Sequence, residues 1–274
     1  MKDEIKRWTK KLFLKIDVDP LYLNYILAIR PSTIPKEIKY RLFGPPDKLS
    51  LPPQRLIWLV GGSPWADNFI KLGELSVVEM TQFLGECGIE ISEFTSILDF
   101  GCGCGRVTRF FRGLDRATIH GSDYNPRLVS WCKENLTFAE FDTNDLAPPL
   151  RYKSDSFDFI FMVSVFTHLD EELQKVWMNE LKRVLAPGGY IYFTTHGEKF
   201  LRLVDTEQRR LFFDGALVVL KEESAGQNIC STVESRRFVE DNLLSGFEMV
   251  RHIPGCAEGF GGQDIFIIRK NRSS

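Results

Sequence analysis

The sequence lacks a large excess of charge of either sign. Its 35 Lys and Arg residues nearly balance 37 Asp and Glu residues, which leaves a formal net charge of -2. A protein that holds a nucleic-acid backbone without regard to base sequence needs a strong positive field, and this composition does not provide one. We therefore expect no nucleic-acid partner, although a local basic patch stays compatible with the composition.

Long apolar runs and paired cysteines are missing as well. No stretch reaches the ~20 apolar residues of a membrane-spanning helix, so we expect no membrane span. The opening MKDEIKRWTKKLF alternates charged and apolar residues, which is not the pattern of a secretory signal. The six cysteines show no C-x-x-C spacing, and a chain this long needs no disulfide framework. These features predict a cytoplasmic protein.

The chain is long enough for one full core and a smaller appended layer. It has 274 residues, of which 43% are hydrophobic. Residues 1–64 are interrupted by prolines and predict a helical, proline-rich extension, with helices at 3–16 and 20–29 and turns across GPPDKLSLPP. The remaining residues, 65–274, form the predicted main domain, with an insertion at about 198–245.

The main domain alternates short apolar runs with helical patterns. This order predicts a doubly wound α/β fold with a mostly parallel seven-stranded sheet. The segments GFEMVRHIP and QDIFIIRK are joined too closely for a crossover helix, so the last strand should be antiparallel. The other predicted strands are 96–100, 117–122, 137–142, 157–163 and 190–195, and the predicted helices are 64–72, 76–87, 105–113, 126–135 and 170–185.

The strongest local motif is ILDFGCGCGR, residues 97–106. A buried strand delivers Asp99, and Gly101, Gly103 and Gly105 allow a sharp turn and close backbone approach to a ligand. The D-x-G-x-G-x-G spacing differs from the dinucleotide pattern G-x-G-x-x-G. An acid at the strand end would repel a pyrophosphate but attract an ammonium group. The motif predicts a ligand that carries an amino acid; the alternative is a glycine-rich turn without function.

A second acid, Asp123, ends the next predicted strand in IHGSDYNP. A carboxylate at this place in an α/β nucleotide site accepts hydrogen bonds from both ribose hydroxyls. The alternative is an ordinary helix N-cap ahead of Pro126. Together with the glycine loop, the ribose role is the favoured interpretation.

Four segments in order carry a family resemblance: ILDFGCGCGR, GSDYNPRLVSWC, FDFIFMVSVFTHL and LKRVLAPGGYIYFTTHG. They resemble the class I S-adenosylmethionine-dependent methyltransferases, from about residue 70 onward and most clearly over residues 92–197. SVFTHL, APGG and GGQDIFII are similar to segments of bacterial enzymes that modify polysaccharides or small metabolites. The resemblance implies S-adenosyl-L-methionine as the cofactor.

The resemblance also implies roles for individual residues. The glycine loop should face the methionine part of the cofactor, and the residue after the ribose acid should flank the adenine. For the adenine amine Asn144 matches best, followed by Asp145, while Asp142 is a competing assignment. The implied cofactor-binding residues are Asp99, Gly101, Cys102, Gly103, Gly105, Asp123, Tyr124, Asn144, Asp145, Ser164, Val165 and Phe166.

Two histidines follow predicted strands at the sheet edge where ligands of open α/β folds collect. A hydroxyl acceptor would need a general base, for which His168 is the first candidate and His196 the second. A structural or merely solvated histidine is the alternative for each. His120 and His252 lie within predicted strands and are expected to be packing or surface residues.

The remaining candidates carry less information. Cys102 and Cys104 alternate with glycine and lack further ligands at metal spacing, so no metal site is expected. The acceptor site should be closed by aromatic residues of the N-terminal part and by the insertion. The alternative for the aromatic residues is core packing, and the alternative for the arginines of the insertion is a solvated helix face. These side chains are Trp58, Trp65, Phe69, Arg202, Arg209 and Arg210.

The sequence thus predicts a methyltransferase that acts on an oxygen of a small-molecule or saccharide acceptor. A non-catalytic cofactor-binding scaffold or sensor is one alternative, and an NAD(P)-dependent oxidoreductase is another. Nucleic-acid methylation is disfavoured because no N-P-P-Y-like signature follows the fourth strand. The identity of the acceptor and the oligomeric state stay open.

Overall fold

The computed structural model describes residues 34–221 and 231–272. The helices predicted at 3–16 and 20–29 lie outside the described residues. None of the helices within the described ranges is long and apolar enough to cross a membrane.

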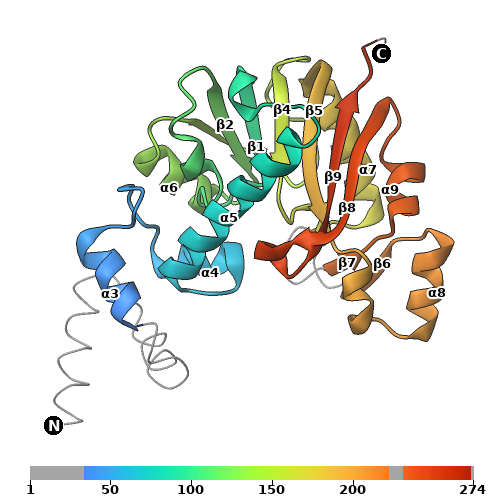
Figure 1. Ribbon diagram of the computed structural model, residues 1–274, viewed down its shortest axis with the longest axis horizontal. Coiled ribbons are helices and arrows are strands. Elements are labelled where there is room, and N and C mark those ends of the chain that lie inside the picture. The colour runs from blue at the N-terminus through green and yellow to red at the C-terminus, as the bar shows by residue number, and fades with distance from the viewer. Residues whose placement is uncertain (1–33, 222–230, 273–274) are drawn as a thin grey trace, which may run out of the picture.

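The main domain is built on a seven-stranded sheet in the order β3-β2-β1-β4-β5-β9-β8 (Figure 1). The first five strands are parallel, and β9 runs antiparallel to both of its neighbours. This topology confirms the predicted doubly wound, mostly parallel sheet with an antiparallel last strand. The strands are β1 Ser96–Phe100, β2 Thr118–Asp123, β3 Glu140–Thr143, β4 Phe157–Met162, β5 Leu185–Thr195, β8 Phe247–Ala257 and β9 Gln263–Lys270.

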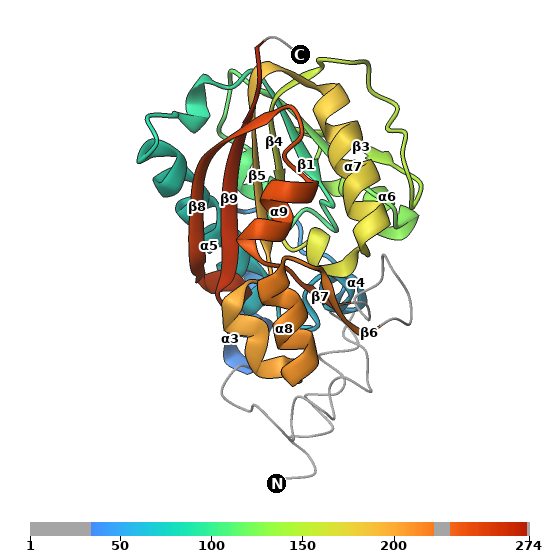
Figure 2. The ribbon, with the colours of Figure 1, turned by 90° about the vertical axis from the view of Figure 1, so that its right-hand side faces the viewer.

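Helices cover both faces of this sheet, with α5 on one side and α7 and α9 on the other (Figure 2). Strand residues alternate between two apolar clusters, because successive side chains point to opposite faces. One cluster contains Leu98 and Trp177, and the other contains Ile97 and Met80. The helices concerned are α5 Ala66–Gly85, α6 Pro126–Asn135, α7 Glu171–Val184 and α9 Arg236–Asn242.

Several local predictions were wrong. The two helices predicted at 64–72 and 76–87 form one continuous helix, α5. Gly73 lies inside it, and a Cβ there would collide with the backbone carbonyl of Arg106, so this glycine allows close packing within the helix. The helix predicted at 105–113 is reduced to a short 3-10 turn, η3 Thr108–Phe111, because Gly105 takes a left-handed conformation with φ of 73°.

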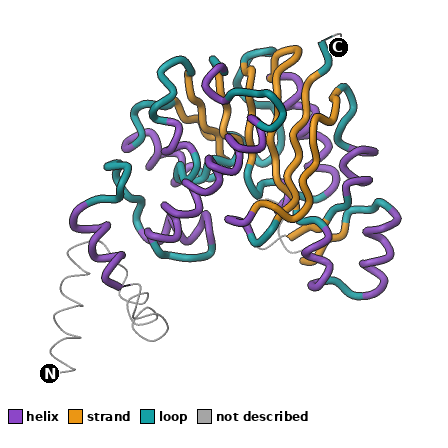
Figure 3. The backbone as a smooth tube through the Cα atoms, in the orientation of Figure 1, coloured by secondary structure: helices purple, strands orange, loops and turns teal. Residues whose placement is uncertain are grey.

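Two helices precede the main domain, α3 Ile34–Phe43 and α4 Gln54–Gly61. The buried carboxylate of Glu37 fixes α3 to the start of α5, since it accepts a hydrogen bond from Ala66 N at 2.8 Å. Satisfying a free amide at a helix start in this way stabilises the junction. Figure 3 shows these helices beside the main sheet, away from the C-terminal end of the chain.

The stretch between α3 and α4 is held by one arginine of the main domain. Arg109 is almost fully buried and forms a two-point ion pair with Asp47. The same guanidinium donates to the carbonyls of Leu49 and Ser50 at 3.3 and 3.2 Å. Such a forked donor suits a carboxylate and carbonyl groups together, and it fixes this part of the extension on the domain.

The segment after β5 forms a small unit of its own and then returns to the core. It pairs β6 Val218–Lys221 with β7 Ser231–Val233, preceded by η5 Glu198–Leu203 and α8 Thr206–Asp214. Its apolar residues form a separate cluster. In Figure 1 this unit and α4 lie at the same lower edge of the sheet, where the parallel strands end.

Candidate active site

The glycine loop after β1 is a junction of three distant parts of the chain. Gly101, Gly103 and Gly105 all have positive φ, at 77°, 55° and 73°, a region that disfavours any side chain. A Cβ at these positions would also collide with side chains of the protein itself, so the glycines are needed for packing as well as for close approach of a ligand. The colliding residues are Val165 at Gly101, Val60 of α4 at Gly103 and Leu136 beyond α6 at Gly105.

Asp99 ends β1 beside this loop and is 4% exposed. Its carboxylate accepts a 2.5 Å hydrogen bond from the Thr108 hydroxyl. Burial, together with repulsion from Asp123, raises the pKa of Asp99 to about 7, and nearby Arg106 lowers it only in part. Two carboxyl groups therefore share one buried region with too little positive charge.

Asp123 ends β2 and is 8% exposed. Its two carboxylate oxygens accept hydrogen bonds from Gly103 N at 2.9 Å and from Asn125 N at 2.8 Å. Burial raises its pKa. The N-cap of α6 is Asn125, whose side chain accepts from Arg127 N, so the alternative role of Asp123 as that cap is wrong. The loop and the second acid are instead joined directly.

The adenine side of the predicted site lies at the end of β3. The amide of Asn144 is occupied within the protein: it accepts from the Ser122 hydroxyl at 2.7 Å and donates to the Asp145 carbonyl at 2.7 Å. Asp145 is exposed, and Asp142 is half-buried with Lys133 at 3.9 Å. Tyr124, directly after the second acid, is 43% exposed.

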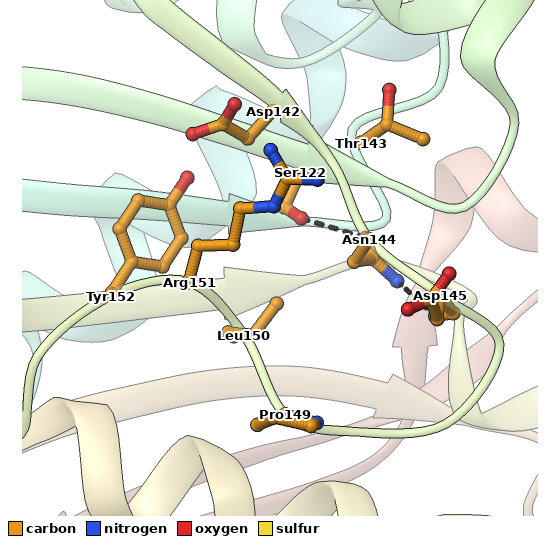
Figure 4. A pocket seen from close by; sticks show the side chains of 9 residues that line it. All are labelled: Ser122, Asp142, Thr143, Asn144, Asp145, Pro149, Leu150, Arg151 and Tyr152. Carbon is orange, nitrogen blue, oxygen red and sulfur yellow. Dashed lines mark hydrogen bonds between the residues drawn. The ribbon is translucent and has the colours of Figure 1, made fainter.

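A small polar hollow of about 40 Å³ lies beneath this region (Figure 4). That volume has room for a few water molecules, because one water needs roughly 10–15 Å³. The lining of the hollow consists of Ser122, Asp142, Thr143, Asn144, Asp145, Pro149, Leu150, Arg151 and Tyr152.

The turn after β4 is held in an unusual conformation. Ser164 has a φ of 61°, which is uncommon for a residue other than glycine and is often found at functional sites. Its amide donates to Thr194 Oγ1 at 2.8 Å, and its hydroxyl accepts from Gln263 Nε2 at 2.9 Å. Thr194 in turn donates to Gln263 Oε1 at 2.7 Å, which closes the ring of bonds.

Neither Thr194 nor Gln263 was among the predicted site residues. The available signal was the predicted antiparallel pairing of the last strand, which brings both to the same sheet edge. Of the other residues predicted in this turn, Val165 lies against Gly101, whereas Phe166 is fully buried in the core cluster of Leu98 and Trp177, so its predicted contact with the cofactor is wrong.

Both candidate histidines lie at this edge. His168 ends the turn η4 Phe166–His168, and His196 follows β5. The Nδ1 atom of His196 is 2.9 Å from the Thr232 carbonyl, which can only accept, so Nδ1 carries the hydrogen and Nε2 keeps a lone pair. Burial, and to a smaller extent His168, lowers the pKa of His196 to about 4.

The other histidines have structural surroundings, as expected. His120 makes edge contacts with Tyr152 and Phe157. His252 bonds to Asp264 at 2.9 Å and stacks on Phe266.

The cysteines and aromatics singled out by the sequence are mostly packed. Cys102 and Cys104 are buried, and burial contributes to raising both thiol pKa values, as expected for unreactive thiols. Across the described ranges, no group of three or more His, Cys, Asp or Glu residues could hold a metal ion. Trp65 and Phe69 belong to the core, while Trp58 on α4 is 45% exposed.

All three arginines of the insertion bond to groups close by in the chain, Arg202 through a hydrogen bond to the Lys199 carbonyl at 3.0 Å. Arg210 pairs with Glu207 and Asp214 on the exposed face of α8. Arg209 donates to the Leu201 carbonyl. Arg202 lies over the ring of Phe200, 5.4 Å from its centroid.

Comparison with known proteins agrees with this geometry. Residues 98–193 match a family described as a methyltransferase domain. The chain is 30% identical over 129 residues to the methyltransferase GfsG of Streptomyces halstedii, covering 45% of this chain and 44% of that protein. It is 33% identical over 101 residues to a fatty-acid O-methyltransferase of Mycolicibacterium smegmatis, covering 36% of each. The chain thus spans less than half the length of these relatives.

Solved structures share the fold at low sequence identity. The PH0226 protein of Pyrococcus horikoshii has a TM-score of 0.53 at 18% identity, covering 72% of this chain and 90% of that protein. An S-adenosylmethionine-dependent methyltransferase of Mesorhizobium loti also has a TM-score of 0.53, at 16% identity, covering 69% and 96%. The domain match favours the methyltransferase prediction over a nicotinamide-dependent oxidoreductase.

Proposed function

We propose that this chain, whose central domain belongs to the class I S-adenosylmethionine-dependent methyltransferase superfamily, transfers a methyl group to an oxygen of a small-molecule or saccharide acceptor. The pair of buried carboxylates at the ends of β1 and β2 carries the cofactor half of this proposal. The two histidines at the ends of β4 and β5 carry the acceptor half.

The residues present fit the cofactor electrostatically. S-adenosylmethionine has a sulfonium and an ammonium group, and the sulfonium supplies an activated methyl group. Asp99 and Asp123 are buried close enough for their charges to repel each other. A cation placed beside them would relieve this repulsion, because an opposite charge favours the ionised carboxylate. A phosphate would add to it.

Within the site we assign Asp99 and the glycine loop, with the backbone of Cys102, to the methionine part, and Asp123 to the ribose hydroxyls. Tyr124 flanks the adenine, and Ser164 and Val165 border the cofactor from the β4 side. The Asn144 amide is already hydrogen-bonded within the protein and stabilises the end of β3. The exposed carboxylate of Asp145 is therefore the better acceptor for the adenine amine. Asp142 is the alternative.

The acceptor hydroxyl loses a proton when its oxygen takes the methyl group, and a neutral imidazole can receive it. We assign this role to His168, with His196 next to it as the second candidate. His196 is neutral at physiological pH and its ring is fixed by the Thr232 carbonyl and by stacking on Phe200. With the reacting groups held in line, positioning supplies most of the remaining rate enhancement.

The first test is calorimetric titration of the full chain with S-adenosylmethionine, S-adenosylhomocysteine and NADH. We expect micromolar binding of the first two and no binding of NADH. Binding of NADH alone would overturn the proposal.

The second test is an acceptor screen with methyl-labelled S-adenosylmethionine. Fatty acids, hydroxylated lipids and saccharides are offered to the wild-type chain and to the Asp123→Ala variant as a cofactor-binding control. Label on an oxygen atom, reduced with the variant at limiting S-adenosylmethionine, supports the proposal. Label on nitrogen or carbon contradicts the oxygen assignment, and tight cofactor binding without transfer to any acceptor supports the scaffold alternative.

A further inference from the structure

A buried acid outside the assigned site lies next to His196. Glu234 follows β7 and is 1% exposed. Its backbone amide donates to the His196 carbonyl at 2.9 Å, which fixes its position relative to the end of β5. Neither of its carboxylate oxygens has a hydrogen-bond partner within the described part of the chain. Such a group is costly to bury in the ionised form.

The neighbour of this acid is the amide of Gln174 on α7, which is completely buried. Gln174 Nε2 already donates to the Phe166 carbonyl at 3.0 Å and to the Leu169 carbonyl at 3.2 Å. An amide nitrogen has two hydrogens, so neither is left for Glu234. Gln174 Oε1 has no partner among the described residues, so it is an acceptor that lacks a donor.

The charges around Glu234 also oppose its ionisation. Asp264 from β9 adds a negative charge and has His252 of β8 as its own partner. His196 contributes a neutral ring from the end of β5. Burial above all raises the pKa of Glu234 to about 8; the adjacent Gln174 side chain lowers it in part, and repulsion by Asp264 raises it further.

We propose that Glu234 is a positioning residue that keeps its proton in the working enzyme and donates it to Gln174, thereby holding the 166–169 turn that carries His168. A protonated acid supplies the one donor that this group of atoms lacks, and Gln174 Oε1 is the acceptor. The role assigned to His168 rests on the proposed methyltransferase function, whereas the hydrogen bond itself does not.

The strand β7 connects this pair to the second histidine. The Thr232 hydroxyl donates to the Phe166 carbonyl at 3.1 Å, and the Thr232 carbonyl accepts from His196 Nδ1. Gln174 and Thr232 therefore hold the same carbonyl of the turn, one from the core and one from the inserted strand. Ionisation of Glu234 removes the donor to Gln174 and places a second negative charge near Asp264. Because Gln174 and Thr232 share the Phe166 carbonyl, this change alters the surroundings of both His168 and His196.

The test is histidine NMR, which needs no acceptor. The chain contains only four histidines, so each imidazole resonance can be assigned by replacement with Gln. Shifts are followed against pH in the wild type, in Glu234→Gln and in Glu172→Gln, a matched control on the exposed start of α7. We expect the His168 or His196 resonance to show an inflection near pH 8 in the wild type and in the control. Glu234→Gln should lack it, because its amide donates at every pH.

Stability gives a second readout. The folded-state pKa of Glu234 lies above its unfolded value of 4.5, so its contribution to stability is present below that value and is lost as pH rises towards 8. The unfolding midpoint of the wild type should fall relative to that of Glu234→Gln over this range. Glu234→Ala, which removes the donor, should have a lower unfolding midpoint than Glu234→Gln at every pH.

Several results would overturn the proposal. One is the absence of any inflection near pH 8 in the wild type, which needs no variant; another is an inflection that persists in Glu234→Gln. Once an acceptor is known, a turnover loss in Glu234→Gln as large as that in Glu234→Ala would also contradict it, because the ionised form would then be the active one. Calorimetry with S-adenosylmethionine on the same samples separates these results from a failure of the proposed function.

Discussion

The two halves of the candidate site are built differently. The acids of the cofactor half come from one continuous stretch, residues 97–123, in which β1, the glycine loop and β2 place two buried carboxylates next to each other. The acceptor half comes from the ends of β4, β5, β7 and β9 and from α7, with imidazoles, amides and hydroxyls. The two acids of one half lie close together in sequence, and the polar groups of the other half are assembled from distant segments.

The difference follows from what each half has to recognise. A cofactor with fixed positive groups suits a fixed pair of acids, and adjacent strands of a parallel sheet present such a pair at one edge. An acceptor is bound where loops and insertions approach that edge, so its side chains come from parts of the chain that only packing brings together.

The largest expected effect separates the halves by function. His168→Ala should lower turnover on an identified acceptor by roughly 10²- to 10⁴-fold, because general-base catalysis contributes about that much. Cofactor affinity should stay unchanged, since the residue lies in the other half. Steady-state kinetics and calorimetry measure the two, with His120→Ala as the control. An unchanged rate would remove His168 as the base and leave His196.

The next effect concerns the packing of the cofactor half. Gly105→Ala should lower the free energy of unfolding by roughly 2–4 kcal/mol, because it forces a positive φ on a residue with a side chain and creates a collision with Leu136. Gly113→Ala, where a Cβ meets open space, should change stability little. Urea unfolding of both variants gives the comparison, and equal stabilities would show that the loop has room to adjust.

The ribose acid should have a smaller effect, which is measured as cofactor affinity. Asp123→Ala should weaken S-adenosylhomocysteine binding by roughly 10- to 100-fold, since hydrogen bonds to a charged group contribute about 1.5–3 kcal/mol. Glu140→Ala, an exposed acid on the neighbouring strand β3, serves as the matched control in calorimetry. Equal affinities in the two variants would contradict the assignment.

The smallest predicted effect is the pH dependence of cofactor binding. Asp99 has a pKa of about 7 in the free protein, and an adjacent cation favours its ionised form, so binding releases its proton. Affinity should therefore rise by about tenfold from pH 6 to pH 8, as one pKa unit corresponds to a factor of ten. Asp99→Asn should lose this rise while keeping any change due to the ligand's own amine. An identical slope in both proteins would exclude Asp99 as the group that titrates.

Sequence reasoning was most reliable where one short segment contains the whole structural reason. The strands at Ser96–Phe100 and Gln263–Lys270 and the helix Pro126–Asn135 were predicted at their observed bounds. It was least reliable where contacts with a distant segment matter. Gly73 lies in the gap between the helices predicted at 64–72 and 76–87, yet it allows the continuous helix α5 to pack against the Arg106 backbone. The short turn η3 also depends on distant contacts, because Thr108 bonds to Asp99 and Arg109 holds residues 47–50.

By itself the sequence determined the sheet, the glycine loop and the two acids at the strand ends, because period, spacing and residue type are local properties of the chain. Tertiary structure alone decided that the Asn144 amide bonds to Ser122, that Gln263 bonds to Ser164 and that Glu234 is buried next to His196. These features depend on which side chains meet across strands far apart in sequence, and on how burial shifts their pKa values, neither of which a linear pattern records.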